Sequence, residues 1–406
     1  MMKGNMAMTA TNNDPDPRTI ARLATGPTTR RRFLGGGAAA AAALTLGPAV
    51  LAGCGSKDST TDTATAPADD GSPASGELRI SNWPLYMAEG FVADFQKASG
   101  LTVDYKEDFN DNEEWFAKHK EALSRRQDIG ADLVVPSDFM MARLKNLGWL
   151  NEIGATRWTN KKNLREALLN SQSDPGRKVS APYMSYMVGL AYNRAATGRD
   201  ITKIDDLWDP AFMGKVSLLS DLQDGLGLIM RAQGNSISEP TTESVQKAAD
   251  LVREQKEKGQ IRRFTGNDYA DDLAAGNIIV AQAYSGDVIQ LQADNPDLRF
   301  VIPESGGLIG ADAMVIPYTT ENQKAAETWI NYLYERPNYA KLVVHTQFVP
   351  VLTDMTDELA KIDPRIASNQ LVNPSPETLA KLTDWAVLTD KQTQEFNTIY
   401  AAITGS

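Results

Sequence analysis

The 406-residue sequence contains one cysteine, Cys54, and two histidines. A single cysteine excludes a disulfide within the chain, and these three residues are too few for a Cys/His metal cluster. Basic residues are also in deficit, because 41 Lys+Arg stand against 52 Asp+Glu and the formal net charge is −11. Nucleic acids and anionic membrane surfaces are bound through lysine and arginine, so the composition argues against both as partners and favours a cation.

The sequence also lacks the short motifs of common enzyme classes, namely G-x-S-x-G, H-E-x-x-H, the P-loop and the dinucleotide fingerprint. The pair Gly225 and Gly227 is weak evidence of a phosphate site, and His119 and His345 lie in stretches typical of packing or surface histidines. Hydrolysis by carboxylates alone stays open, but nothing singles out one acid and one base. We therefore expect a protein that is not an enzyme and needs neither a cofactor nor a metal.

Residues 1–53 have the features of an export signal. Residues 29–34, Thr-Arg-Arg-Arg-Phe-Leu, carry a twin-arginine signal, and the weakly hydrophobic run at 35–50 is too short for a membrane span. That run ends in Leu-Ala-Gly-Cys at 51–54, which looks like a bacterial lipobox with Cys54 as the lipidated residue. The alternative is an ordinary cleaved signal peptide that leaves Cys54 as a free thiol.

Residues 54–76 are expected to form a flexible tether behind the lipidated cysteine. They are mostly Ser, Thr, Asp, Ala, Pro and Gly without an aromatic residue, and such a segment cannot bury enough apolar surface to offset its ordering entropy. We expect the mature protein on the outer face of the cytoplasmic membrane, held there by its lipid anchor only. No other stretch approaches transmembrane length.

Beyond residue 76, short apolar runs bounded by turns alternate with segments of helical period. Strands are expected near residues 78–80, 101–105, 133–135, 216–219, 278–281 and 313–316, and helices near 91–100, 115–126, 245–252 and 325–333. This alternation predicts an α/β protein with mostly parallel strands, and the strands are numerous enough for two sheets.

Aromatic and acidic residues follow several of these strands, where open α/β sheets bind their ligands. The candidates for aromatic faces are Trp83, Tyr86, Phe139 and Tyr284. The candidates for charge are Asp221, Asp224 and Asp312, of which Asp312 lies just before the expected strand at 313–316. A bound organic cation needs carboxylates for each ammonium and aromatic faces along its methylene chain, which add about 0.5–2 kcal/mol per contact. Taken singly, each residue fits core packing or helix capping equally well. For Asp138 and Asp287 we favour a cap or a solvated position.

Four motifs of the body occur in a characteristic order and spacing. They are Asn82-Trp83-x-x-Tyr86, Asp-Leu-Val-Val-Pro-Ser at 132–137, Leu219-Ser220-Asp221-x-x-Asp224, and Gly306-Gly307 followed by Asp312. In this arrangement, which extends from Glu77 to Ala402, the sequence resembles polyamine-binding proteins. These are the substrate-binding subunits of spermidine/putrescine ABC transporters.

The resemblance implies a two-lobed periplasmic-binding-protein fold of type II, in which each lobe is a mixed, mostly parallel sheet flanked by helices. The ligand would lie in the cleft between lobe 1, residues 77–187 plus 309–355, and lobe 2, residues 188–308 plus 356–406. The resemblance implies that Trp83 and Tyr86 stack on the alkylamine and that Ser137 and Phe139 close one side of the pocket. It implies that Asp221 and Asp224 bind one ammonium. Asp312 would bind the other amine beside the Tyr284 ring.

By this resemblance we expect a monomeric, extracytoplasmic substrate-binding lipoprotein of an ABC importer, which delivers putrescine or spermidine to the permease subunits and their ATPase. The ligand would stabilise a closed state of the two lobes. Two alternatives stay open. One is the same fold with another ligand, such as an amino acid, a cationic osmolyte or a metal ion, and the other is a surface or sensor lipoprotein without a transport role.

The sequence departs from the family pattern at four places. Gly310 stands where an aromatic residue is usual, residues 347–350 lack a tyrosine before their proline, Ala386 replaces a glutamine after Trp385, and Asp224 replaces a longer glutamate. These departures predict a pocket that is wider and poorer in hydrogen bonds than a typical spermidine site.

Overall fold

The computed structural model describes residues 69–405. The twin-arginine signal, the lipobox with Cys54 and most of the expected tether lie outside the described residues. Among the described residues, no helix is both long and apolar enough to cross a membrane.

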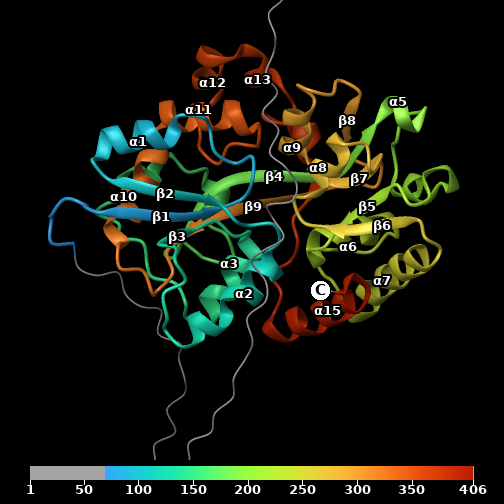
Figure 1. Cartoon of the computed structure of the whole chain (residues 1–406), viewed down its shortest axis with the longest axis horizontal. Coiled ribbons are helices and arrows are strands. Elements are labelled where there is room, and N and C mark those ends of the chain that lie inside the picture. Colours follow the sequence, from blue (N-terminus) through green and yellow to red (C-terminus); the bar gives the residue numbers. More distant parts are fainter. Residues whose placement is uncertain (1–68, 406) are drawn as a thin grey trace, which may run out of the picture. The chain divides into compact units, whose positions relative to one another are not determined.

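The described strands form one hydrogen-bonded sheet, in which neighbouring strands follow the order β2-β1-β3-β9-β4-β7-β5-β6, with β10 paired to β9 and β8 to β4 (Figure 1). The strands are β1 Glu77–Asn82, β2 Thr102–Glu107, β3 Leu133–Val134, β4 Ser180–Asn193, β5 Val216–Leu219, β6 Ile261–Thr265, β7 Val280–Tyr284, β8 Leu298–Val301, β9 Gly307–Val315 and β10 Leu382–Thr383.

The sheet has a parallel group at each end and antiparallel pairing in between. β1 is parallel to β2 and β3, and β5 is parallel to β6 and β7. β4 is antiparallel to β7, β8 and β9, and β9 is antiparallel to β3, so the 14-residue β4 and its partner β9 connect the two groups. Every residue of β4 except Asn193 is buried, as expected for a central strand covered on both faces. The strands that the sequence allocates to two sheets are therefore joined into one.

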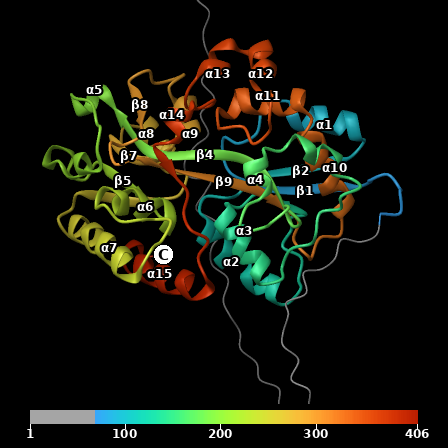
Figure 2. The same ribbon diagram turned by 180° about the vertical axis from the view of Figure 1, so that it is seen from behind.

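Helices cover both faces of this sheet. Figures 1 and 2 show α1 and α11 on one face and α2, α3, α7 and α15 on the other. The helices are α1 Phe91–Ser99, α2 Asn112–Ser124, α3 Asp138–Asn146, α4 Glu166–Leu169, α5 Arg194–Thr197, α6 Leu222–Ala232, α7 Thr242–Glu257, α8 Tyr269–Ala274, α9 Ser285–Leu291, α10 Gln323–Leu333, α11 Arg336–Thr346, α12 Thr356–Ile362, α13 Pro364–Ser368, α14 Pro376–Leu379 and α15 Asp390–Thr404, with 3₁₀ turns at Thr159–Asn163, Ile204–Trp208 and Pro210–Phe212.

Helix α10 shows how the sequence pattern produces these elements. Its apolar residues recur at helical spacing, and Ala326, Trp329, Ile330 and Leu333 are all buried. The next helix begins at Arg336 with a proline in its first turn, where the missing amide hydrogen has no helical partner to lose. The expected helix at 325–333 is thus confirmed.

Three strand-to-helix junctions position the polar residues of the candidate site. Ser137 precedes α3 as its N-cap residue, Asp221 precedes α6, and Tyr284 ends β7 and precedes α9. A residue at such a junction lies beyond the carboxyl end of its strand, where open α/β sheets bind ligands.

Candidate ligand-binding site

A cavity with about 300 Å³ of empty space, including its open mouth, lies beyond these strand ends. We call it the inner cavity, and its lining residues are Trp83, Pro84, Tyr86, Ser137, Tyr186, Asn267, Tyr284, Asp287, Asp312 and Phe348. Of the eight residues that the sequence assigned to ligand binding, five line it: Trp83, Tyr86, Ser137, Tyr284 and Asp312.

Asp312 is held by hydrogen bonds to both of its oxygens. The Tyr86 hydroxyl donates to Oδ2 at 2.7 Å, and the Ser137 hydroxyl donates to Oδ1 at 2.8 Å. Burial raises the pKa of Asp312 to about 7, while the two hydroxyl donors oppose this shift because they stabilise the carboxylate. The arrangement presents an oriented carboxylate whose negative charge is not neutralised by a basic side chain.

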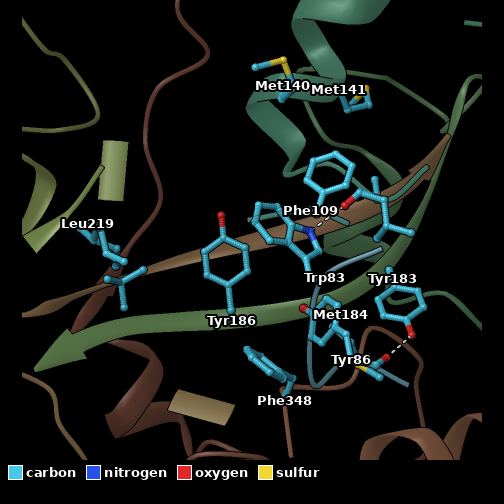
Figure 3. Packing of buried hydrophobic residues seen from close by; sticks show 14 of the residues in the cluster. Trp83, Tyr86, Phe109, Met140, Met141, Tyr183, Met184, Tyr186, Leu219 and Phe348 are labelled. Atoms are coloured by element: carbon cyan, nitrogen blue, oxygen red, sulfur yellow. Dashed lines mark hydrogen bonds between the residues drawn. The ribbon is translucent and has the colours of Figure 1, made fainter. Parts of the chain in front are cut away.

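Aromatic rings form the walls around this carboxylate. The Tyr86 ring contacts Phe348 edge-on, with ring centroids 4.8 Å apart, and lies 5.1 Å from Tyr183. Trp83 is held by a hydrogen bond from Nε1 to the carbonyl of Val135 at 2.7 Å (Figure 3). The ring faces are thereby fixed before any ligand binds, which lowers the ordering cost of binding.

Asp287 is a second carboxylate of the inner cavity, and the expectation that it is a cap or a solvated residue is wrong. It lies in the first turn of α9 but is only 1% exposed. Oδ2 accepts hydrogen bonds from the Tyr269 hydroxyl at 2.6 Å and from Asn267 at 3.1 Å, whereas Oδ1 has no partner among the described residues. Burial raises its pKa to about 7. The signal in the sequence was its position three residues after Tyr284, at a strand end.

Asp224 and Asp221 lie outside the inner cavity's lining. The Tyr284 hydroxyl donates to Asp224 Oδ2 at 2.8 Å, so the tyrosine stands between Asp224 and the cavity. Asp221 accepts a hydrogen bond from Asn112 Nδ2 at 2.8 Å, and its Oδ1 has no partner among the described residues. Burial raises the pKa of Asp224 to about 7, and burial together with the charges of Asp111 and Asp224 raises that of Asp221 well above its usual range.

Phe139 and Asp221 face a neighbouring outer cavity, together with Asp384 and Trp385. Burial raises the pKa of Asp384 to about 6. Trp385 is followed by Ala386 and not by the glutamine of the family pattern. Its Nε1 donates a hydrogen bond to the carbonyl of Gln223 at 2.9 Å. Of the eight sequence-assigned residues, five thus line the inner cavity, Phe139 and Asp221 line the outer cavity, and Asp224 lines neither.

The space beside Gly310, where the family pattern has an aromatic residue, is occupied by another ring. Gly310 pairs with Tyr186 in the β9–β4 ladder, and the tyrosine ring occupies the space beside it, because a Cβ at position 310 would lie 2.6 Å from the Tyr186 ring. Phe348 likewise supplies a ring in the segment that lacks the expected tyrosine. Tyr186 and Phe348 thus supply aromatic rings to the cavity walls.

Asp138 lies in the first turn of α3 with its side chain 25% exposed, and it has a structural partner. Arg177, which is 1% exposed, donates to its two oxygens at 2.8 and 3.1 Å. No arginine or lysine lines the described inner cavity. The described residues also contain no cluster of His, Cys, Asp and Glu that could hold a metal ion. The inner cavity is therefore suited to an organic cation, because buried carboxylates need a counter-charge.

Several relatives and solved structures resemble this chain. A spermidine/putrescine-binding periplasmic protein of Salmonella typhimurium is 26% identical over 305 residues, which are 75% of this chain and 85% of that protein. A putrescine/cadaverine-binding protein of Pseudomonas aeruginosa is 26% identical over 343 residues, 81% of this chain and 94% of that protein. A putrescine-binding periplasmic protein of Escherichia coli is 28% identical over 327 residues, 75% of this chain and 85% of that protein.

Among solved structures, a putative spermidine/putrescine ABC transporter protein from Listeria monocytogenes aligns with a TM-score of 0.71 at 23% identity and covers 80% of this chain and 98% of that one. A lipoprotein of Treponema pallidum aligns with a TM-score of 0.68 at 22% identity and covers 81% and 100%. These alignments confirm the α/β, two-lobed periplasmic-binding-protein fold of type II. The model of the bacterial extracellular solute-binding proteins matches residues 90–372. Because this match covers more than half of the chain, the protein belongs to that family, which binds solutes.

Proposed function

We propose that this protein binds a polyamine of the putrescine or spermidine class and delivers it to the permease of an ABC importer. The observation that carries the proposal is the pair of buried carboxylates, Asp287 and Asp312, in a cavity walled by aromatic rings and lined by no basic side chain of the described chain. Ammonium groups would neutralise the carboxylates, and a methylene chain would pack on the rings. The relatives named for spermidine, putrescine and cadaverine support this ligand class.

The rival ligands fit this cavity less well. An amino acid or an anion needs a positive side chain such as arginine for its negative group, and the described lining of the inner cavity contains none and presents Asp287 and Asp312. A metal ion needs several clustered ligands, which the described residues do not provide.

Closure of two lobes is the proposed mechanism, with residues 77–187 plus 309–355 as one lobe and 188–308 plus 356–406 as the other. Hydrogen bonds between residues assigned to different lobes support it: Asn112 donates to Asp221 at 2.8 Å, and the Asn267 amide donates to the carbonyl of Asn110 at 3.0 Å. A ligand that contacts both lobes stabilises the closed state by its higher affinity for that state, and the permease would recognise the closed form.

An extracytoplasmic location agrees with the family description. We further propose export through the twin-arginine signal, lipidation at Cys54 and a monomeric mature protein. Replacement of Cys54 by serine should release the protein from the membrane fraction of the producing cell and abolish labelling by a radioactive fatty acid. Labelling that persists in Cys54→Ser would refute this anchor.

Calorimetric titration of the purified protein with putrescine, spermidine and spermine tests the ligand class, with histidine, betaine and Fe(III) as controls. We expect saturable binding of a polyamine at micromolar concentrations or below and no heat from the controls. If a control binds and no polyamine does, the ligand assignment is wrong while the family assignment stands.

A further inference from the structure

Tyr186 lies on the central strand β4, opposite a glycine of β9. It pairs with Gly310 in the β4–β9 ladder, and its hydroxyl and ring carbons fill the space that any side chain at position 310 would enter. Strand position 310 has no positive φ, so the backbone itself does not require glycine there. The glycine is required by the tyrosine ring on the neighbouring strand.

The same ring lines the inner cavity and lies near Asp224, which does not line that cavity. Tyr186 lines the inner cavity with Asp287 and Asp312, and its ring meets the Tyr284 ring edge-on with centroids 5.2 Å apart. In Figure 3 it stands between Trp83 and Leu219, the last residue of β5. Asp221 and Asp224 follow Leu219 along the chain and do not line the inner cavity. Burial and then the charges of Asp224 and Asp312 raise the pKa of Tyr186, which agrees with a hydroxyl located between these carboxylates.

The charges of the inner cavity match a diamine. Its described lining contains the carboxylates of Asp287 and Asp312, one for each ammonium of a diamine. A triamine brings a third ammonium. Asp224 is bound by the Tyr284 hydroxyl and Asp221 faces the outer cavity, so that third charge has no carboxylate in the inner cavity. A buried charge without a partner costs several kcal/mol.

We propose that Tyr186 is a specificity-determining residue that closes the inner cavity and selects short diamines over triamines. This inference rests on the proposed polyamine-binding function and deepens it. Removal of the Tyr186 ring would open the inner cavity toward Asp224, which then becomes available to a third ammonium beside the Tyr284 hydroxyl.

The test is calorimetric titration of the wild-type protein, Tyr186→Ala and Tyr186→Phe with putrescine and with spermidine. We expect the wild type to bind putrescine about tenfold or more tightly than spermidine, and Tyr186→Ala to reverse or abolish that preference. Tyr186→Phe is the matched control, because it keeps the ring and should keep the preference for putrescine.

A second pair of variants tests the contact with Gly310 independently. Gly310→Ala should displace the ring and weaken putrescine binding about tenfold, whereas the same change in the Tyr186→Ala background should have little effect, since the clash is gone. If the two effects simply add, the ring does not depend on Gly310, and the inference fails.

The possible failures are distinguishable. If the wild type binds spermidine as tightly as putrescine and Tyr186→Ala leaves the ratio unchanged, the selection by Tyr186 is refuted and the polyamine-binding function stands. If the wild type binds neither amine, the proposed function itself fails, and this inference fails with it.

Discussion

The Tyr86 hydroxyl donates a hydrogen bond to Asp312 Oδ2 at 2.7 Å, although the two residues are 226 positions apart in the chain. The backbone of Asp312 also forms an antiparallel bridge with Ser137, whose hydroxyl binds the other carboxylate oxygen at 2.8 Å. Three distant segments therefore fix one carboxylate. Its orientation is established by the fold, so a cationic ligand meets a site that is already organised.

Replacement of Asp312 by asparagine is expected to weaken putrescine binding about tenfold or more, because one ammonium of the bound ligand then has no counter-charge. Calorimetric titration measures the change. Asp294→Asn is the matched control, since Asp294 is exposed and the variant should bind as the wild type does. Equal affinity of Asp312→Asn and wild type would remove Asp312 from the site.

The second prediction concerns pH. The pKa values of Asp224, Asp287 and Asp312 are raised from 3.8 to about 7 by burial. Between about pH 4 and pH 7 these carboxyl groups therefore bind more protons in the folded protein than in the unfolded chain. Their contribution to the free energy of unfolding falls as the pH rises through that range. Putrescine needs the ionised carboxylates, so its affinity should be highest above pH 7 and should decrease as the pH falls.

Thermal unfolding with and without putrescine tests these opposite pH dependences of stability and putrescine affinity. At about pH 8 the ligand should raise Tm strongly, and at about pH 5.5 the ligand-dependent rise should be much smaller. The double variant Asp287→Asn, Asp312→Asn is the control, in which the ligand effect should be small at both pH values. A ligand-dependent rise in Tm that is independent of pH in the wild type would contradict the prediction.

The third prediction separates binding from stability at Asp287. Asp287→Asn should weaken putrescine binding about tenfold and at the same time leave the ligand-free protein equally or more stable above pH 7. The reason is that asparagine keeps an acceptor for the Tyr269 hydroxyl but removes a buried charge whose Oδ1 has no partner among the described residues. Titration and urea unfolding measure the two effects. A loss of stability without a loss of affinity would show a structural role instead.

The fourth prediction concerns the contact between Gly266 and Asn110. A Cβ at position 266 would collide with the Asn110 carbonyl oxygen, which accepts the Asn267 amide at 3.0 Å. If this contact forms only on closure, Gly266→Ala should weaken putrescine binding about tenfold with little change in the Tm of the ligand-free protein.

Small-angle scattering provides the second readout for Gly266. Putrescine should reduce the radius of gyration of the wild type but not that of Gly266→Ala. Asn110→Ala serves as the graded control, because it removes the side-chain hydrogen bond to the Asp268 amide at 3.2 Å without creating a clash. Compaction of Gly266→Ala equal to that of the wild type would exclude this contact from the closure.

The fifth prediction tests the structural role of Asp138. Asp138→Asn should lower the free energy of unfolding by about 3 kcal/mol, because the buried Arg177 loses its counter-charge, while putrescine affinity stays unchanged. Asp128→Asn is the matched control. Asp128 forms a partly exposed ion pair with Arg79, so Asp128→Asn should lower the free energy of unfolding by less than about 1 kcal/mol, as measured by urea unfolding. A change in affinity for Asp138→Asn would place Asp138 at the ligand.

Local sequence patterns are enough to predict the fold class and much of the candidate site. Apolar runs such as 133–135 and periodic segments such as 325–333 reveal strands and helices, since burial imposes those periods locally. Trp83 and Ser137 are recognisable because they occur in motifs after strands, and Asp312 because it follows the Gly306-Gly307 pair, although the structure places it inside β9; the family resemblance adds their order.

Which of these residues share a cavity follows from the packing of distant segments. Whether Asp287 is solvated or buried depends on the Tyr269 hydroxyl and on what covers α9, which no local pattern records. That Tyr186 fills the space left by Gly310 depends on the register of β4 against β9, and this register pairs residues more than a hundred positions apart. Local periodicity therefore specifies elements and their exposed or buried faces, whereas strand register and helix packing specify which side chains meet.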